Sequence, residues 1–319
     1  MARETRGAYG RPDPADGGWL VLSVPAPARG EELLLIDALR RVGARAVERR
    51  GHRYEALLPP GGSDPVRQVV AEATAAVRAS TSLGDPQIRW YRLPHEEWAR
   101  GWRRGQPERR VSDRIVIAPA MGGGPAADPD GPGDAVGRGE PTTRRVRLEP
   151  AVAFGTAEHA TTRACLRILD RRLRSGDRIL DVGAGSGVLG IAAAVLGASR
   201  VLALESDPAS CEAVRRNASL NGVAKRIEVR RGEVRPGDLG SVGRFDGVLA
   251  NLGGAVLISL SGDLAAAVER DGWIALSGVL RAERDAVIAA GRRAGLSLAA
   301  EEREAGWWTG VFLPASGGR

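Results

Sequence analysis

Lysine is almost absent from this 319-residue chain: Lys225 is the only one, so arginine carries nearly all of the positive charge. The formal net charge is +7. A basic protein is attracted to polyanions, so this composition is compatible with a nucleic-acid contact. Charge alone therefore permits such a partner without identifying one.

Cysteine and histidine are also scarce, with two and three residues respectively. Cys165 and Cys211 fall in different predicted helices, so we expect reduced thiols in the core rather than a disulfide. His159 alone would be a poor metal site. We also find no Ser/His/Asp triad. The sequence therefore predicts neither a metal site nor a catalytic triad.

No stretch of the chain is long and apolar enough to span a membrane. Residues Met1–Pro14 are charged and lack the apolar centre of a signal peptide. Hydrophobic residues make up 43% of the chain, and its length suits two domains. We expect a soluble, monomeric, cytoplasmic protein that does not contact membranes.

The first 93 residues contain strand and helix patterns in the order βαββαβ. The second helix pattern is preceded by Ser63, a suitable N-cap, and has Pro65 in its first turn. This order predicts a small ferredoxin-like α+β domain over residues 1–93. The expected elements are the strand 18–25, the helix 31–42, the strands 44–49 and 53–58, the helix 64–79 and the strand 87–93.

Residues 94–143 are expected to connect this domain to the rest of the chain. His95–Gln106 has the pattern of a basic helix in which Trp98 and Trp102 share a face. Such a helix either contacts RNA or an acidic protein, or it is a connector whose tryptophans pack on a domain. A strand is expected over residues 112–119. Residues 122–143 are rich in glycine and proline, which predicts a flexible insertion.

Strands alternate with helices over residues 144–319, which predicts a doubly wound, mostly parallel sheet. Only a few residues around Gly306 separate the last two strand patterns, so these should form an antiparallel hairpin. The predicted helices are 162–173, 188–196, 208–221, 255–269 and 281–294, and the predicted strands are 145–148, 178–182, 200–205, 226–230, 245–251, 273–277, 296–302 and 307–313.

The most informative stretch is Arg178–Leu189, RILDVGAGSGVL, where a strand ends near Asp181 and three glycines precede a helix. Glycine tolerates positive φ and lets a ligand lie against the backbone. The spacing of Gly185, Gly187 and Gly190 also fits a dinucleotide fingerprint. However, the carboxylate of Asp181 would repel a pyrophosphate, which favours a ligand bearing an amino group or a sulfonium. A tight turn without a ligand is the third interpretation.

Two more strands are predicted to end on polar residues at the same edge of the sheet, where open α/β folds bind ligands. Glu205 ends the second strand, at a position where a carboxylate can bind both ribose hydroxyls of an adenosine. Asp207 is expected to cap the next helix. Glu233, in the loop after the third strand, is a candidate contact to the adenine ring. Asn251 ends the fourth strand and can accept a hydrogen bond from an amine.

These residues favour methyl transfer from a sulfonium to an amine. That reaction is an in-line displacement, which needs alignment, a neutral amine and exclusion of water more than a strong acid or base. Asn251, helped by a backbone carbonyl in the following turn, would aim the nitrogen lone pair at the methyl group. We therefore expect Asn251 to be the catalytic residue.

The chain resembles the PrmA family of class I S-adenosylmethionine-dependent methyltransferases, which methylate ribosomal protein L-eleven (L11). The resemblance is carried by Phe154–Thr162 (FGTAEHATT), Asn251–Gly254 (NLGG), Ser277–Leu280 (SGVL) and the segment from Trp98 to Pro119. It covers nearly the whole chain except the first residues and the insertion. It implies a Rossmann-like sheet with a terminal antiparallel hairpin, preceded by a ferredoxin-like substrate-recognition domain.

The resemblance also implies the partners and the site. The implied acceptor is L11, free or on the large subunit, methylated on lysine side chains or the N-terminus, with ribosomal RNA as a further contact. Thr156 would contact the methionine end of S-adenosylmethionine. The full set of implied or candidate cofactor-binding residues is Phe154, Thr156, Asp181, Gly183, Gly185, Glu205, Glu233 and Asn251.

Several residues depart from the family pattern. Ala157-Glu158 stands where the family has glycine and threonine, Ala160 replaces proline, and Gly253-Gly254 follows Asn251. Two alternatives stay open. The arginine-rich segment Trp98–Arg114 is compatible with a methyltransferase acting on RNA or another protein, and the changes at Ala157-Glu158 and Gly253-Gly254 with a non-catalytic module that binds S-adenosylmethionine.

Overall fold

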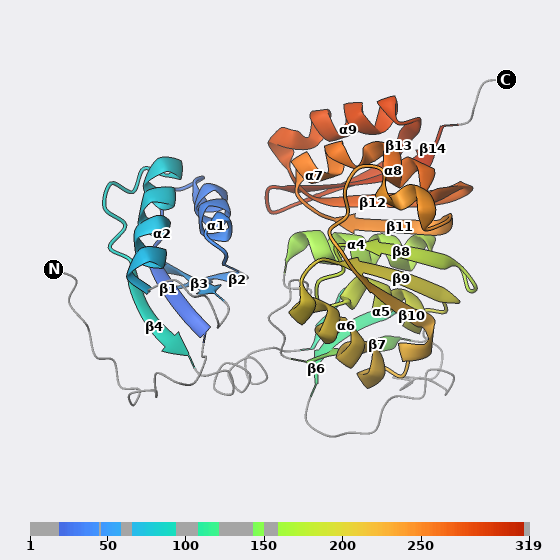
Figure 1. Ribbon diagram of the computed structural model, residues 1–319, viewed down its shortest axis with the longest axis horizontal. Helices are drawn as coiled ribbons and strands as arrows, with labels where there is room; N and C mark the ends of the chain where they lie inside the picture. The colour runs from blue at the N-terminus through green and yellow to red at the C-terminus, as the bar shows by residue number, and fades with distance from the viewer. Residues whose placement is uncertain are drawn as a thin grey trace. The chain divides into compact units, whose positions relative to one another are not determined.

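The computed structural model describes residues 19–44, 46–58, 66–93, 108–120, 143–149 and 159–315 (Figure 1). The chain divides into two compact units, Met1–Arg104 and Gly105–Arg319. Each unit has its own sheet and its own apolar core. Among the described residues, no helix has the length and apolar character needed to cross a membrane.

The first unit is a four-stranded antiparallel sheet with two helices on one face (Figure 1). The strand order is β2-β3-β1-β4. Alternate residues of β1, including Leu20, Leu22 and Val24, pack with apolar residues of the helices because successive side chains of a strand point to opposite faces. The elements are β1 (Trp19–Pro25), α1 (Glu32–Arg41), β2 (Ala46–Arg50), β3 (Arg53–Leu58), α2 (Val66–Ser80) and β4 (Arg89–Leu93).

The succession βαββαβ is therefore present in this unit, with small shifts at the ends of elements. β2 and β4 each begin two residues later than the sequence predicted. The expected cap at Ser63, the Trp98–Trp102 helix and the insertion at 122–143, apart from Thr143, lie outside the described residues.

A three-stranded sheet begins the second unit. It consists of β5 (Arg109–Arg110), β6 (Ile115–Pro119) and β7 (Arg144–Leu148), and β6 pairs in parallel with β7. The strand predicted within the connector therefore pairs with the strand that follows the insertion. Arg114, just before β6, forms an ion pair at 2.5 Å with Asp170. This pair attaches the small sheet to the helix that contains Asp170.

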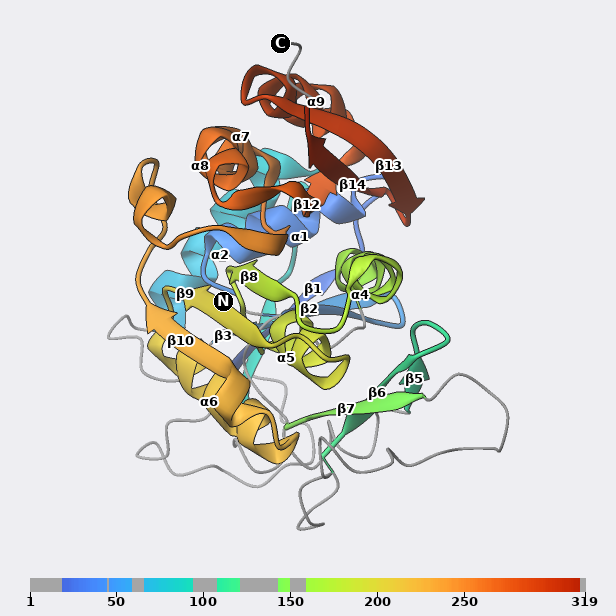
Figure 2. The ribbon, with the colours of Figure 1, turned by 90° about the vertical axis from the view of Figure 1, so that its right-hand side faces the viewer.

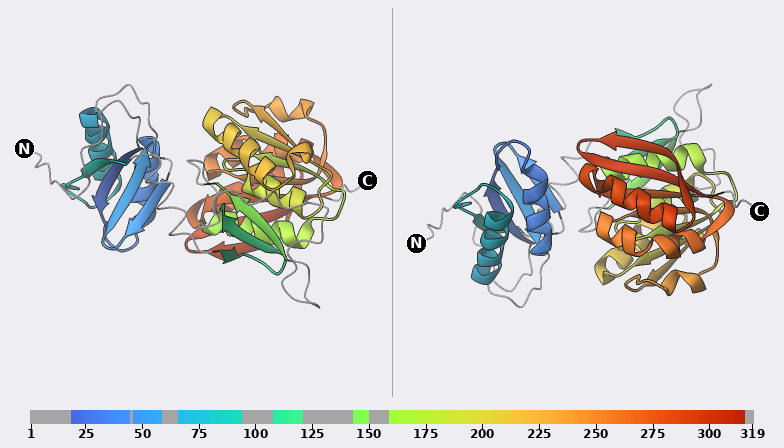
Figure 3. Two further views of the ribbon diagram at one scale, coloured as in Figure 1. Left: turned by 90° about the horizontal axis from the view of Figure 1, so that it is seen from below. Right: turned by 90° about the horizontal axis from the view of Figure 1, so that it is seen from above.

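The main sheet has seven strands in the order β10-β9-β8-β11-β12-β14-β13 (Figures 1 and 2). The first five run parallel, while β14 pairs antiparallel with both neighbours. The predicted terminal hairpin is confirmed and is drawn in red in the right-hand view of Figure 3. The strands are β8 (Arg178–Val182), β9 (Arg200–Glu205), β10 (Ile227–Arg231), β11 (Phe245–Asn251), β12 (Val268–Leu280), β13 (Leu296–Glu304) and β14 (Trp307–Pro314).

Helices cover both faces of this sheet. Leu180 and Val182 of β8 belong to one core with residues of α7, α8 and α9. Asp181 lies between them in sequence and faces α5 on the opposite side, where its carboxylate meets Gly190. The helices are α4 (Ala160–Arg172), α5 (Val188–Val195), α6 (Pro208–Leu220), α7 (Gly254–Ser259), α8 (Ser261–Ala266) and α9 (Arg284–Arg293).

The region after β11 differs from the prediction. The expected single helix 255–269 is two short helices, α7 and α8, which meet at Leu260. Strand β12 begins at Val268, inside the predicted helix, because Val268 is buried and pairs with Phe245 of β11. Long-range pairing with β11 thus overrides the local helical pattern. The prediction of reduced core cysteines is confirmed, since Cys165 and Cys211 are both free and buried.

Candidate functional site

The turn between β8 and α5 has the conformation that its glycines permit. Gly183, Gly185 and Gly187 adopt φ values of +73°, +57° and +82°. A Cβ on Gly183 would lie 2.5 Å from a methyl carbon of Leu252, and a Cβ on Gly187 would lie 2.9 Å from Val214. Both the backbone angle and the available space therefore require glycine at these two positions.

Asp181 lies beneath this turn rather than at its open side. Its side chain is 1% exposed, and its carboxylate accepts a hydrogen bond from the backbone N–H of Gly190 at 3.0 Å. Burial raises the pKa of Asp181 to about 7, although the bond from Gly190 opposes the shift. Asp181 thus fixes the first turn of α5 to the end of β8. Its predicted contact with a cofactor remains a prediction.

Glu205 connects the end of β9 to the glycine turn. One carboxylate oxygen accepts the N–H of Gly185 at 2.8 Å, and the other accepts the N–H groups of Ser206 and Asp207 at 2.8 and 2.9 Å. Three backbone donors therefore hold a half-buried carboxylate directly against the turn. The predicted N-cap is confirmed, because the side chain of Asp207 accepts the N–H of Ser210 at 3.0 Å.

Asn251 ends β11, which is the neighbour of β8 on the side opposite β9. Its amide nitrogen lies 3.4 Å from the hydroxyl oxygen of Thr162 in α4. Its amide oxygen is buried and has no hydrogen-bond partner among the described residues. A buried acceptor without a donor costs about 1–3 kcal/mol, so this oxygen suits a ligand that brings an N–H group.

The structure therefore brings three of the predicted side chains to one edge of the sheet. Glu205, Asp181 and Asn251 lie at the carboxyl ends of the adjacent strands β9, β8 and β11. Glu233 follows β10, is largely exposed, and forms an ion pair with Arg235 at 2.9 Å. Phe154 and Thr156 lie outside the described residues.

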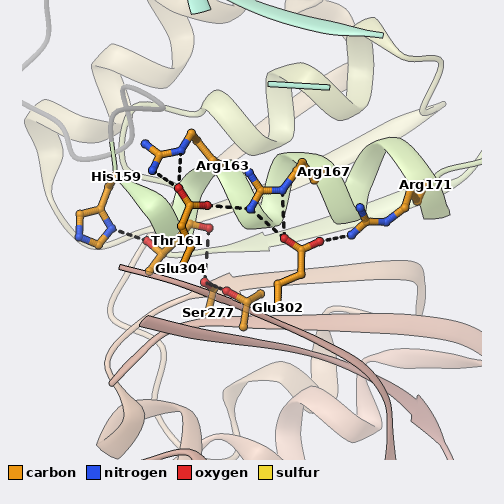
Figure 4. Close-up of polar contacts among 9 residues, drawn as sticks. His159, Thr161, Arg163, Arg167, Arg171, Ser277, Glu302 and Glu304 are labelled. Carbon is orange, nitrogen blue, oxygen red and sulfur yellow. Dashed lines mark hydrogen bonds and ion pairs between the residues drawn. The ribbon is translucent and has the colours of Figure 1, made fainter. Parts of the chain in front are cut away.

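Sequence reasoning assigned no role to a group of buried hydroxyls beside Asn251. The hydroxyl of Ser277 in β12 donates to the backbone carbonyl of Thr161 at 3.3 Å and lies 2.6 Å from the hydroxyl of Thr309 in β14. Thr161 also contacts Nδ1 of His159 at 2.7 Å (Figure 4). The sequence signals were the pair of threonines that ends the Phe154–Thr162 segment and Ser277 at the start of the Ser277–Leu280 segment.

A second network holds the C-terminal hairpin against α4 (Figure 4). Arg163, Arg167 and Arg171 are spaced four residues apart and therefore share a face of the helix. They form ion pairs with Glu302 and Glu304 of β13, including contacts from Arg167 at 2.8 and 2.9 Å. These pairs fix α4, which contains Thr162, relative to the edge of the sheet.

The site fits S-adenosylmethionine. The three glycines expose backbone beside the Glu205 carboxylate, which can accept from hydroxyls, and the Asn251 oxygen can accept from an amine. A parallel sheet with a terminal antiparallel hairpin and this edge defines a class I S-adenosylmethionine-dependent methyltransferase.

The comparisons with known proteins identify the family. The sequence model of the ribosomal protein L11 methyltransferase family (PrmA) matches residues 61–312. The chain belongs to this family.

Individual relatives show how far the likeness extends. A ribosomal protein L11 methyltransferase from Geobacter sulfurreducens is 40% identical over 213 residues, which cover 66% of this chain and 64% of that relative. One from a Synechococcus strain is 31% identical over 314 residues, which cover 93% of this chain and 97% of the relative. The first match thus covers slightly less than two thirds of its relative.

A solved structure agrees with these matches. The ribosomal protein L11 methylase from Lactobacillus delbrueckii subsp. bulgaricus is 26% identical, with a TM-score of 0.55. The match covers 66% of this chain and 100% of that one.

Proposed function

We propose that this protein transfers methyl groups from S-adenosylmethionine to amino groups of ribosomal protein L11, on lysine side chains or the N-terminus. The observation that carries the proposal is the oxygen of Asn251 at the carboxyl end of β11, which is buried and has no hydrogen-bond partner within the described part of the chain. Membership of the L11 methyltransferase family supports L11 as the acceptor.

Several residues would contribute to binding the cofactor. Gly183 and Gly185 would place bare backbone against the cofactor, while Glu205 would accept from its ribose hydroxyls. Asp181 would support the turn from below through its bond to Gly190. The family resemblance adds Phe154 and Thr156 as cofactor contacts, and Glu233 stays a candidate adenine contact. The cofactor supplies a methyl group activated by a positively charged sulfur.

Asn251 would orient the acceptor. Its buried oxygen can accept one N–H of a neutral amine, which would turn the nitrogen lone pair toward the methyl group. An alkylammonium has no lone pair, so the amine must lose a proton before transfer. Alignment of this kind, together with exclusion of water, supplies much of the rate enhancement in displacement reactions.

We further propose that three parts of the chain have different functions. Residues 1–93 would recognise the protein substrate, residues 94–143 would connect, and residues 144–319 would carry out methyl transfer. We propose that the protein acts as a monomer in the cytoplasm, on L11 that is free or on the large subunit, with ribosomal RNA as a further contact.

Label transfer from methyl-labelled S-adenosylmethionine to unmodified L11 tests this function. We expect labelled amines that mass spectrometry locates on lysines or the N-terminus, and a loss of at least about 100-fold in rate for Asn251→Ala. Calorimetry of the wild type checks cofactor binding independently. Binding without label on any protein or RNA would establish a non-catalytic module, and label confined to RNA would replace L11 as the acceptor.

A further inference from the structure

The orientation of the Asn251 side-chain amide decides which atom faces an incoming amine. An amide presents an acceptor at its oxygen and two donors at its nitrogen, so a half-turn of the group would exchange attraction for repulsion of an N–H. The position of the amide also depends on the group bound at its far end, and a hydroxyl there can accept from the nitrogen or donate to the oxygen. In this protein that group is the hydroxyl of Thr162, 3.4 Å from the amide nitrogen.

The side chain of Thr162 is held in place by its surroundings. It lies in the first turn of α4 and is 1% exposed, so its side chain is enclosed by protein. The residue before it, Thr161, is anchored through its carbonyl by the hydroxyl of Ser277 at 3.3 Å. Ser277 is also the residue of β12 directly opposite Asn251 in the parallel pairing of β11 with β12.

The strands around Asn251 leave little freedom for the amide to move as a whole. Leu252 donates its N–H to the carbonyl of Ser277 at 2.9 Å, which extends the pairing past Asn251. A Cβ on Gly278 would lie 2.4 Å from the carbonyl oxygen of Leu252 and 3.1 Å from the amide oxygen of Asn251. The backbone of Gly278 therefore closes one side of the amide. The Thr162 hydroxyl lies at the nitrogen of the same amide and restrains it there.

We propose that Thr162 is a positioning residue for methyl transfer. Its hydroxyl accepts a hydrogen bond from the Asn251 amide nitrogen, which restrains the amide at the position where it would meet the acceptor amine. This inference rests on the proposed function, because it assigns the Asn251 oxygen to the amine. Thr162 itself need not touch cofactor or substrate, and its effect should therefore fall on turnover rather than on binding.

Two substitutions of Thr162 separate the effect of its hydroxyl from the effect of its side-chain size. Thr162→Val keeps the shape and removes the hydroxyl, whereas Thr162→Ser keeps the hydroxyl. Ser261→Ala is the control for loss of a hydroxyl, because Ser261 of α8 donates to the carbonyl of Ile258 at 3.0 Å and lies outside the hydroxyl group around Ser277. Each variant is measured for kcat and KM with L11 and for cofactor Kd.

We expect Thr162→Val to lower kcat about tenfold, with KM and cofactor Kd within about twofold of wild type. Thr162→Ser should restore kcat to within about twofold, and Ser261→Ala should stay in that range as well. A Thr162→Val enzyme with wild-type kcat would overturn the inference. An equal loss of kcat in Thr162→Ser would do the same, because the hydroxyl could not then be the cause.

A second measurement does not depend on the acceptor. The side-chain amide of Asn251 gives a pair of nitrogen–proton NMR signals, which Asn251→Ala identifies by their disappearance. We expect these signals to shift in Thr162→Val and to stay near their wild-type positions in Thr162→Ser and Ser261→Ala. Unchanged signals in Thr162→Val would refute the contact. If wild type fails to methylate L11, the proposed function is wrong, and the NMR comparison still decides whether Thr162 holds the amide.

Discussion

Arg167 should stabilise the second unit more than its neighbour Arg171, although both pair with glutamates of β13. Arg167 bridges two carboxylates, with contacts of 2.8 Å to Glu302 and 2.9 Å to Glu304. Among the residues that the structure describes, Arg171 pairs with Glu302 alone. The side chain of Arg167 is 28% exposed and that of Arg171 is 58% exposed. The more buried arginine thus holds the hairpin from the centre of the network.

The expected magnitudes follow from this difference. Exposed ion pairs contribute about 0.2–1 kcal/mol, and removing one partner of a buried pair costs about 3–5 kcal/mol. Arg167 lies between these limits and leaves two carboxylates close together when it is removed. We therefore expect Arg167→Leu to lower the free energy of unfolding by about 2 kcal/mol, and Arg171→Leu by less than about 1 kcal/mol.

The effect of Arg167 should also depend on pH. Burial raises the pKa of Glu304, but the hydrogen bonds from Arg163 and Arg167 outweigh it and hold the pKa below its ordinary value. A carboxyl group with a depressed pKa stabilises the folded state above its unfolded pKa, and this contribution is lost as the pH falls through the folded pKa. The free energy of unfolding of wild type should therefore exceed that of Arg167→Leu by its largest amount at pH 7, and this difference should shrink below about pH 4.5.

Hydrogen exchange of the peptide that covers residues 296–314, measured by mass spectrometry in the full chain, reports on the hairpin specifically. Urea unfolding followed by circular dichroism gives the free energy of unfolding of the whole protein. Faster exchange in Arg167→Leu than in Arg171→Leu is the expected result. Equal protection in the two variants, or a difference that grows toward acid pH, would refute the assigned role of Arg167.

Three further substitutions test the site and its support. Gly183→Ala should destabilise the fold by about 1–3 kcal/mol and weaken cofactor binding, because the residue has φ +73° and no room for a Cβ; thermal unfolding and calorimetry measure both effects. Asn217→Leu should lower the free energy of unfolding, measured in urea, by about 2–4 kcal/mol. The buried amide of Asn217 accepts the N–H of Glu149 at 2.8 Å and donates to the carbonyl of Ser186 at 2.9 Å. The pKa of Asp181, raised to about 7, predicts that wild type loses stability relative to Asp181→Asn as the pH rises from 4 to 7, in cofactor-free unfolding experiments.

Each of these tests has a comparison that could contradict it. Gly176→Ala is the control for Gly183, because Gly176 has φ +93° but nothing within 4 Å of the position that a Cβ would occupy. An equal loss of stability in Gly183→Ala and Gly176→Ala would show that the backbone angle alone causes the destabilisation. A fully stable Asn217→Leu protein would show that its two hydrogen bonds contribute nothing net. A flat pH difference between wild type and Asp181→Asn would contradict the raised pKa.

Local sequence determined much of this fold. The glycines of the β8–α5 turn, the cap at Asp207 and the short connection at Gly306 depend on backbone angles and nearest neighbours, and all appear in the structure where the sequence predicted them. The alternation of strands and helices also fixed the order in which Asp181, Glu205 and Asn251 follow strands. Because parallel strands end at one edge, that order was enough to place the three together.

Tertiary structure decided what those residues contact. The sequence places Asp181 at the glycine turn, and packing directs its carboxylate beneath that turn toward Gly190. The helix expected to reach residue 269 gives way to β12, because burying and pairing Val268 outweighs a local helical preference. The contact of Asn251 with Thr162 joins residues 89 positions apart, and no local pattern predicts it. Sequence thus determined which groups reach the edge of the sheet, while long-range packing determined how each is oriented there, because orientation depends on neighbours that only the folded chain brings together.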